Sequence, residues 1–281
     1  MKSKFLLSLQ KQWSKGKFVC VGLDPVYEKL PLIVRKKYKS IDDAYFQFNK
    51  AIIDATADLV CAYKPQVVHY EESGELGLKA LIKTRKYLLK RFPHIPVILD
   101  AKRADIGSTN EYYTKAYFDV MKFDAVTVHP YLGQEAMEPF LKRADKGIIV
   151  LVRTSNPGAG EFQDLKVDKS EPLYLKVAKN VAREWNKNGN CAIVVGATYP
   201  RELLQIRKAV GDLPILIPGI GAQGGDLEKT VKAGKDSKKQ GMIIHASRSI
   251  IFSSSGSDFA EAARTEAQRL TDEINKYRLS K

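Results

Sequence analysis

Asp100, Lys102 and Asp105 fall within six consecutive positions, directly after the apolar, β-branched stretch 97–99. Two carboxylates and an ammonium beside a buried strand cost desolvation free energy. They could form an ion pair at the rim of a sheet. They could instead form a catalytic array, in which neighbouring charges shift each other's pKa so that a proton can be moved. On an extended chain residues i and i+2 point to the same side, so Asp100 and Lys102 are expected to project together.

A regular framework has to position these charges, and short apolar runs recur along the whole chain. Apolar runs in which polar residues do not alternate with apolar ones are typical of strands buried on both faces of a parallel sheet. In this chain, stretches with helical periodicity separate most of the runs. Eight such units in 281 residues favour an α/β fold, a closed (β/α)8 TIM barrel, over an open doubly wound sheet, and we expect a single domain over residues 1–281. The expected strands are Phe18–Leu23, Leu59–Tyr63, Val97–Leu99, Ala125–Val128, Gly147–Val152, Cys191–Val195, Leu213–Pro218 and Met242–Ala246, and the expected helices include Ile41–Ala57, Gly77–Arg91, Gly107–Met121, Leu173–Asn188, Pro200–Val210, Gly225–Ala233 and Ser257–Tyr277.

Polar residues follow the predicted strands at the point where each strand ends. In barrels of this kind, chemistry lies where strands end and the following loops begin. We therefore expect one ring of polar groups on one face of the barrel. It includes Asp24, Lys64, Asp100, Lys102, Asp105, His129, Ser155 and Arg248. The stretch 154–172 is a long loop, and long loops in compact domains are often functional.

Gly219, Gly221 and Gly224 match the spacing G-x-G-x-x-G after a predicted strand. A dinucleotide-binding domain normally opens with this motif and needs several strands after it, whereas here one further unit follows. We favour a phosphate cradle of backbone N–H groups in the loop after the seventh strand. Arg248 would supply a fork-shaped partner for the phosphate oxygens, with a salt bridge at the rim as the alternative.

Several classes of protein are disfavoured by what the chain lacks. Cys20, Cys61 and Cys191 lie in or beside apolar runs without a Cys-x-x-Cys pair, so we expect no disulfide or structural zinc, and we expect a cytoplasmic location. The four histidines show no metal-ligand spacing. No apolar run approaches the ~20 residues that span a bilayer, and Met1–Gln10 indicates an amphipathic helix rather than a signal peptide.

The charge balance raises a second kind of function. The 46 Lys and Arg residues against 32 Asp and Glu residues give a net charge of +14, so RNA binding is weighed against an enzyme. The lysines are spread along predicted helices, and no basic run is interleaved with aromatic residues. Solvated helix faces account for the charge better, and we expect no nucleic-acid or membrane partner. A basic chain also suits a small phosphorylated anion.

Taken together, the motifs resemble the orotidine 5′-phosphate decarboxylase family, in its longer bacterial branch, type 2. They span nearly the whole chain. The Asp-x-Lys-x-x-Asp element is typical of the superfamily, and the glycine-rich loop narrows it to the decarboxylase. The motifs are Gly22-Leu-Asp24-Pro, Tyr63-Lys64-Pro, Asp100-Ala-Lys102-Arg-Ala-Asp105-Ile-Gly-Ser-Thr109, Thr154-Ser155-Asn-Pro-Gly158, Val195-Gly-Ala-Thr198, Pro218-Gly-Ile-Gly221-Ala-Gln223-Gly-Gly and Ser247-Arg248-Ser-Ile. His245-Ala-Ser-Arg248 departs from the Val-Gly-Arg of shorter members, which leaves the phosphate contacts around Arg248 open.

This resemblance implies decarboxylation of orotidine 5′-phosphate to uridine 5′-phosphate in pyrimidine biosynthesis, without a metal or cofactor. Lys102 would protonate C6 of the pyrimidine, Asp100 would face the substrate carboxylate, and Lys64 and Asp105 would complete the charged array. A homodimer with shared active sites is implied, because Asp105 and Thr109 would reach into the partner subunit's site. The implied substrate contacts are Asp24 to the ribose, Ser155 and Gln223 to the pyrimidine and the closing loop, and Pro218, Gly221 and Arg248 around the phosphate.

A rival enzyme within the same superfamily is a magnesium-dependent sugar-phosphate decarboxylase, which shares the Asp-x-Lys-x-x-Asp element. Such an enzyme needs additional carboxylate ligands at the strand ends. The second predicted strand is followed by Lys64 instead of a carboxylate. The sequence therefore favours the metal-free alternative.

Overall fold

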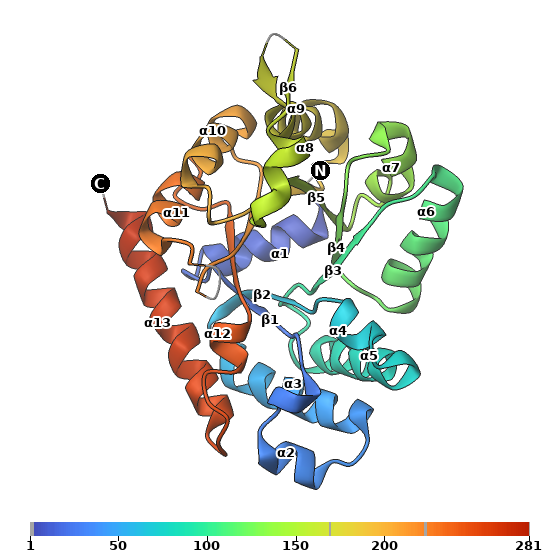
Figure 1. Cartoon of the computed structure of the whole chain (residues 1–281), viewed down its shortest axis with the longest axis vertical. Helices are drawn as coiled ribbons and strands as arrows, with labels where there is room; N and C mark the ends of the chain where they lie inside the picture. Colours follow the sequence, from blue (N-terminus) through green and yellow to red (C-terminus); the bar gives the residue numbers. More distant parts are fainter. Residues whose placement is uncertain (1–2, 169, 222–223, 281) are drawn as a thin grey trace.

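The computed structural model describes residues 3–168, 170–221 and 224–280, and within them eight parallel strands curl into a barrel surrounded by helices (Figure 1). The strands follow the order β2-β1-β10-β9-β8-β5-β4-β3. The two ends of this sheet meet where Tyr63 N donates to Pro96 O at 3.1 Å and Asp100 N donates to Pro65 O at 3.0 Å. The predicted (β/α)8 barrel is confirmed. Its strands are β1 Val19–Gly22, β2 Val60–Lys64, β3 Ile98–Arg103, β4 Ala125–Val128, β5 Gly147–Arg153, β8 Cys191–Val195, β9 Ile215–Pro218 and β10 Met242–Ala246.

The apolar runs become strands because both of their faces are covered. Every residue of β1, β2, β4, β8 and β10 is buried, as a parallel barrel requires of strands that face packed side chains inside and helices outside. Each of the eight predicted runs overlaps one of these barrel strands. The α-helices are α1 Lys4–Trp13, α2 Leu32–Lys37, α3 Ile41–Thr56, α4 Val68–Glu71, α5 Gly74–Arg91, α6 Gly107–Thr114, α7 Gly133–Leu141, α8 Gly160–Gln163, α9 Leu173–Asn180, α10 Pro200–Val210, α11 Leu227–Gly234, α12 Arg248–Ile251 and α13 Phe259–Leu279.

Helix α1 covers the amino-terminal end of the barrel, opposite the loops that follow the strands. Its Phe5 ring lies so close to the start of β5 that a Cβ on Gly147 would fall 2.3 Å from Phe5 Cδ1. The expected amphipathic first helix is confirmed, and it buries Phe5, Leu9 and Trp13. With this end closed, the barrel is open to ligands on its other face.

An aromatic stack joins the end of the chain to its beginning. The Phe48 ring of α3 lies 5.7 Å from the Phe252 ring and 5.4 Å from the Phe259 ring of α13, measured between centroids. This contact places the last helix beside the first barrel helix, so the ring of helices closes together with the ring of strands (Figure 1).

The structure adds detail to two predicted helices and to the long loop. The stretches expected as helices at 107–121 and 173–188 continue beyond α6 and α9 as π-helical turns, Lys115–Val120 and Val181–Trp185. The loop 154–172 carries α8 and a small hairpin of β6 Lys166–Val167 and β7 Glu171–Pro172. Two-residue strands are too short to show a periodicity, so the sequence pattern did not reveal them.

Candidate active site

A cavity of about 680 Å³ opens where the barrel strands end. Its wall brings together residues from all eight barrel strands or the loops that follow them, at the face expected from the sequence. The predicted site residues that line it are Asp24, Lys64, Asp100, Lys102, Ser155, Pro218 and Arg248. Residues far apart in the chain therefore form one site.

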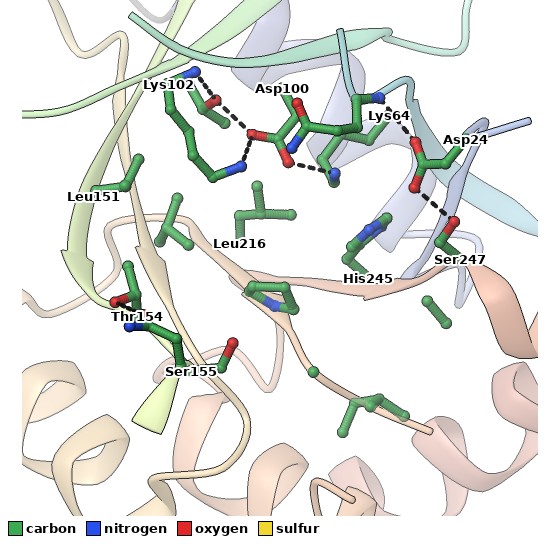
Figure 2. Close-up of a pocket in the computed structure, with 18 of the residues that line it drawn as sticks. Asp24, Lys64, Asp100, Lys102, Leu151, Thr154, Ser155, Leu216, His245 and Ser247 are labelled. Carbon is green, nitrogen blue, oxygen red and sulfur yellow. Dashed lines mark hydrogen bonds and ion pairs between the residues drawn. The ribbon is translucent and has the colours of Figure 1, made fainter. Parts of the chain in front are cut away.

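Asp100 lies between two ammonium groups on one wall of the cavity (Figure 2). Its Oδ2 accepts a hydrogen bond from Lys64 Nζ at 2.6 Å, and its Oδ1 accepts one from Lys102 Nζ at 2.7 Å. Burial alone would raise the pKa of Asp100, but the two ammonium groups outweigh it and hold that pKa below its usual range. Burial would likewise lower the pKa of Lys64, but the carboxylates of Asp100 and Asp24 outweigh it and raise that pKa. Asp100 and Lys64 therefore both stay charged at neutral pH.

The chain does not remain extended between Asp100 and Lys102. The pairing of β3 with β4 shifts register between Leu99 and Arg103, and Lys102 has a φ of +47°, which is uncommon for a residue with a side chain. The prediction that the two side chains project together is confirmed, but its reason, a regular strand, is wrong. The bulge leaves the Lys102 side chain 45% exposed, whereas Lys64 is 3% exposed, so Lys102 is the ammonium nearer the opening.

Asp24, after β1, is held by the two neighbouring strands. Its Oδ1 accepts from the Gln66 backbone N at 2.8 Å, and its Oδ2 accepts from Ser247 Oγ at 2.6 Å. Gly22 is required here, because a Cβ on it would lie 2.4 Å from Ser247 Cβ. These contacts fix a carboxylate at the cavity wall, beside the charged array.

The glycine-rich loop and Arg248 form another part of the wall. Gly219 and Gly221 have φ values of +108° and +79°, a region that favours glycine. Arg248, at the start of α12, lines the cavity. Gly221 belongs to the same loop without lining the cavity, and it packs so that a Cβ would fall 2.9 Å from Ser249 Oγ. Gln223, the other residue predicted in this loop, lies outside the described residues.

Two predicted site residues, Asp105 and Thr109, are not part of the cavity wall of their own chain. Asp105 Oδ1 accepts from Ile106 N at 2.7 Å in the turn that begins α6. The buried Asn110 holds this turn, since its Oδ1 accepts from Asp105 N at 3.0 Å and its Nδ2 donates to Asp105 O at 2.7 Å. These hydrogen bonds fix the turn, and Asp105 lies in it without lining the cavity of its own chain.

Sequence reasoning did not single out several polar residues of the cavity wall, among them Thr127 and His245. Thr127 Oγ1 donates to Asp100 Oδ1 at 2.7 Å and accepts from Lys102 N at 3.0 Å, so it fixes both ends of the bulge. His245 Nδ1 lies 3.1 Å from Cys20 O, and burial, reinforced by Lys64, lowers the pKa of this imidazole to about 3. The available signal was a polar residue inside an otherwise apolar predicted strand.

The described parts of the chain contain no group of three His, Cys, Asp or Glu side chains arranged to hold a metal ion. Across the same residues, none of the helices combines the length and the apolar character that a membrane crossing requires.

Comparison with known proteins gives matches that run through the whole barrel. The family model described as orotidine 5′-phosphate decarboxylase / HUMPS family matches residues 17–264. The orotidine 5′-phosphate decarboxylase of Cellvibrio japonicus is 49% identical over 272 residues, which cover 96% of this chain and 98% of that one.

Solved structures show the same fold. The orotidine monophosphate decarboxylase of Leishmania donovani superposes with a TM-score of 0.84 and 33% identity, covering 99% of both chains. The UMP synthase of the same organism gives a TM-score of 0.88 and 35% identity over 100% of this chain, which spans 57% of that longer chain.

Proposed function

This chain belongs to the orotidine 5′-phosphate decarboxylase / HUMPS family, and from that premise we propose how its cavity carries out the reaction. The protein is a carboxy-lyase that converts orotidine 5′-phosphate to uridine 5′-phosphate and carbon dioxide in pyrimidine biosynthesis. The observation that carries this function is the Asp100 carboxylate held between Lys64 and Lys102, in a cavity that Arg248 also lines.

The reaction breaks the bond between C6 and the carboxylate, and the electron pair stays on C6 as carbon dioxide leaves. No π system delocalises this pair, so the protein has to stabilise it electrostatically. The Lys102 ammonium neutralises the developing charge and then gives its proton to C6, after which it regains a proton from water. Asp100 faces the departing carboxylate, and its charge favours that departure. Lys64 keeps Asp100 ionised and in place.

The other predicted residues of the cavity bind the ribose, the pyrimidine and the phosphate of the nucleotide. Asp24 offers fixed carboxylate oxygens to the ribose hydroxyls, and Ser155 contacts the pyrimidine. Arg248 and the loop around Pro218 and Gly221 bind the phosphate, which contributes binding energy at a distance from the reacting carbon. The role implied for Gln223 remains a proposal of the same kind.

The working unit that we propose is a homodimer with shared sites. Asp105 and Thr109 do not line their own cavity, as expected of residues that complete a partner's site. Exposed apolar side chains follow β2, β3 and β4, which are neighbours in the barrel, and such a patch suits a protein interface. The patch consists of Val68, Ile106, Tyr131 and Leu132, which are 54%, 60%, 89% and 40% exposed.

Two further expectations remain proposals. The three cysteines are free and buried, and burial raises the pKa of Cys20 and Cys191 to about 12, so these thiols are unreactive and suit the cytoplasm. A single hydrophobic core that extends from Phe5 to Ile274 supports one domain over 1–281.

The direct test follows the ultraviolet absorbance of orotidine 5′-phosphate as it is converted, with and without excess EDTA. We expect equal rates in both samples, because the charged array supplies the stabilisation. Loss of activity in EDTA that added Mg²⁺ restores would instead support the magnesium-dependent alternative.

A further inference from the structure

Arg153 is a buried cation that the proposed chemistry does not use. It is the last residue of β5, its side chain is 3% exposed, and it lies behind the cavity wall rather than in it. A buried guanidinium costs desolvation free energy unless its donors are satisfied. Its contacts therefore indicate what the residue is for.

The guanidinium joins the loop after β5 to helix α8. Nη2 donates to Asp164 Oδ2 at 3.2 Å, and Nε lies 3.1 Å from Asp164 Oδ1 as an ion pair without hydrogen-bond geometry. Nη1 donates to the Thr154 carbonyl oxygen at 3.0 Å and lies 3.5 Å from Gln163 Oε1. The guanidinium also lies over the ring of Tyr199, with Cζ 3.9 Å from the ring centroid. We call Arg153, Gln163, Asp164 and Tyr199 the Arg153 cluster.

The Arg153 cluster fixes the backbone that leads directly into Ser155. Gln163 Oε1 accepts from Thr154 N at 2.9 Å, and Gln163 Nε2 donates to Thr154 Oγ1 at 2.9 Å. Both hydrogen-bonding groups of the Thr154 backbone are thus bound to the cluster. Ser155 is the next residue, and it lines the cavity.

The loop after β8 holds Ser155 from the other side. Gly196 N donates to Arg153 O at 2.8 Å, and a Cβ on Gly196 would lie 2.7 Å from Ser155 Cβ and 2.8 Å from Ser155 Cα. Tyr199, which belongs to the Arg153 cluster, follows in this same loop. Ser155 is therefore confined between two loops, and the Arg153 side chain contacts both.

We propose that Arg153 is a positioning residue that places Ser155 against the pyrimidine of the bound nucleotide. This inference rests on the proposed role of Ser155 in the cavity. A planar guanidinium is needed because it donates in two directions within its plane while one face covers the Tyr199 ring. A lysine ammonium would keep the charge without this geometry.

The test is a double-mutant cycle between Arg153 and Ser155 on purified enzyme. Arg153→Met should lower kcat/KM for orotidine 5′-phosphate by about tenfold to a hundredfold, the size expected for a misplaced contact. In a Ser155→Ala background the same change should cost less than about twofold, because the residue that it positions is gone. Arg153→Lys should not restore activity.

Arg85→Met is the matched control, because Arg85 is also a buried arginine but contacts Lys122 O and Asp124 before β4, at the other end of the barrel. It should lower the melting temperature while kcat/KM of the folded enzyme stays within about twofold. If Arg153→Met leaves too little folded protein, Asp164→Asn can be used instead, because it removes one partner of the Arg153 guanidinium. Its loss of kcat/KM should be smaller than that of Arg153→Met, and that loss should again nearly disappear in the Ser155→Ala background.

If Arg153→Met lowers kcat/KM as strongly in the Ser155→Ala background as in the wild type, Arg153 does not act by positioning Ser155. Wild-type kcat/KM of Arg153→Lys would also overturn the positioning role. Wild-type kinetics of Ser155→Ala alone would overturn the proposed role of Ser155, and this inference with it. The cycle thus separates the two failures.

Discussion

The Lys102 ammonium lies 2.7 Å from Oδ1 of Asp100, although the strand that carries both residues is interrupted between them. The interruption gives Lys102 its φ of +47°. A backbone conformation of this kind costs about 1–3 kcal/mol and persists only where its surroundings impose it. Here Thr127 Oγ1 accepts from Lys102 N, so the neighbouring strand holds the residue in place.

Replacing Lys102 with alanine should abolish turnover while the fold survives. The change removes both the cation beside the carbanion and the proton donor, so the rate should fall by at least about a thousandfold. Ultraviolet assay measures the loss, and circular dichroism checks the fold. Lys50→Ala is the control, since Lys50 pairs with Asp54 on the outer surface of α3. Near-normal decarboxylation by the Lys102 variant would contradict the mechanism.

Replacing Lys102 with glycine should give a more stable protein than replacing it with alanine. Both changes remove the same charge, but glycine adopts a positive φ without a steric cost. The free energy of unfolding of Lys102→Gly should therefore exceed that of Lys102→Ala by about 1 kcal/mol. Urea unfolding of the two variants measures the difference. Equal stabilities would mean that the bulge relaxes when the lysine is removed.

Two inactive variants should complement each other if active sites are shared. In a mixed dimer of Lys102→Ala and Asp105→Ala, one site has Lys102 from one subunit and Asp105 from the other. Random reassembly should restore about a quarter of wild-type activity, because half of the dimers are mixed and each has one intact site. The measurement is activity after the variants are unfolded and refolded together. A mixture no more active than its components would show that Asp105 does not act across an interface.

Arg248→Ala should weaken the reaction only when the substrate carries a phosphate. Hydrogen bonds to charged groups contribute about 1.5–3 kcal/mol, so kcat/KM for orotidine 5′-phosphate should fall about tenfold to a hundredfold. Turnover of orotidine, which lacks the phosphate, should change less than about twofold. An equal loss of kcat/KM for orotidine 5′-phosphate and for orotidine would show that Arg248 does not act by binding the phosphate.

The sequence predicted the barrel well because a strand covered on both faces leaves a clear pattern. A short run such as Cys191–Val195, apolar at every position, fits a buried parallel strand far better than an exposed element. The polar residues that end such runs had to meet at one face. Lys64, Asp100 and Asp24 could therefore be placed in one site before any contact was known.

The features that could not be predicted depend on contacts between distant parts of the chain. A lysine in the sequence does not indicate a positive φ, so the bulge at Lys102 could not be predicted. Thr127 stood in an apolar run, where a hydroxyl is as often satisfied by its own backbone as by a distant carboxylate. The turn that holds Asp105 depends on its hydrogen bonds with Asn110, and no spacing within the motif reveals them.

His245 should make the protein less stable in mild acid. Burial, together with the nearby Lys64, lowers the pKa of His245 to about 3 in the folded protein, whereas an unfolded chain has a histidine pKa of about 6.5. Between these values the unfolded state binds a proton that folded His245 does not, so stability falls as the pH is lowered from 6.5. From pH 6.5 to 5 this amounts to about 2 kcal/mol.

His245→Asn removes the group that binds this proton. When the pH falls from 7.5 to 5, the free energy of unfolding should therefore decrease by about 2 kcal/mol less in His245→Asn than in the wild type. Urea unfolding at the two pH values measures both losses, and His129→Asn controls for the removal of a histidine as such. Equal losses in the wild type and His245→Asn would show that His245 takes up a proton in the folded protein. The cavity would then carry one more positive charge below pH 6.5, beside Lys64.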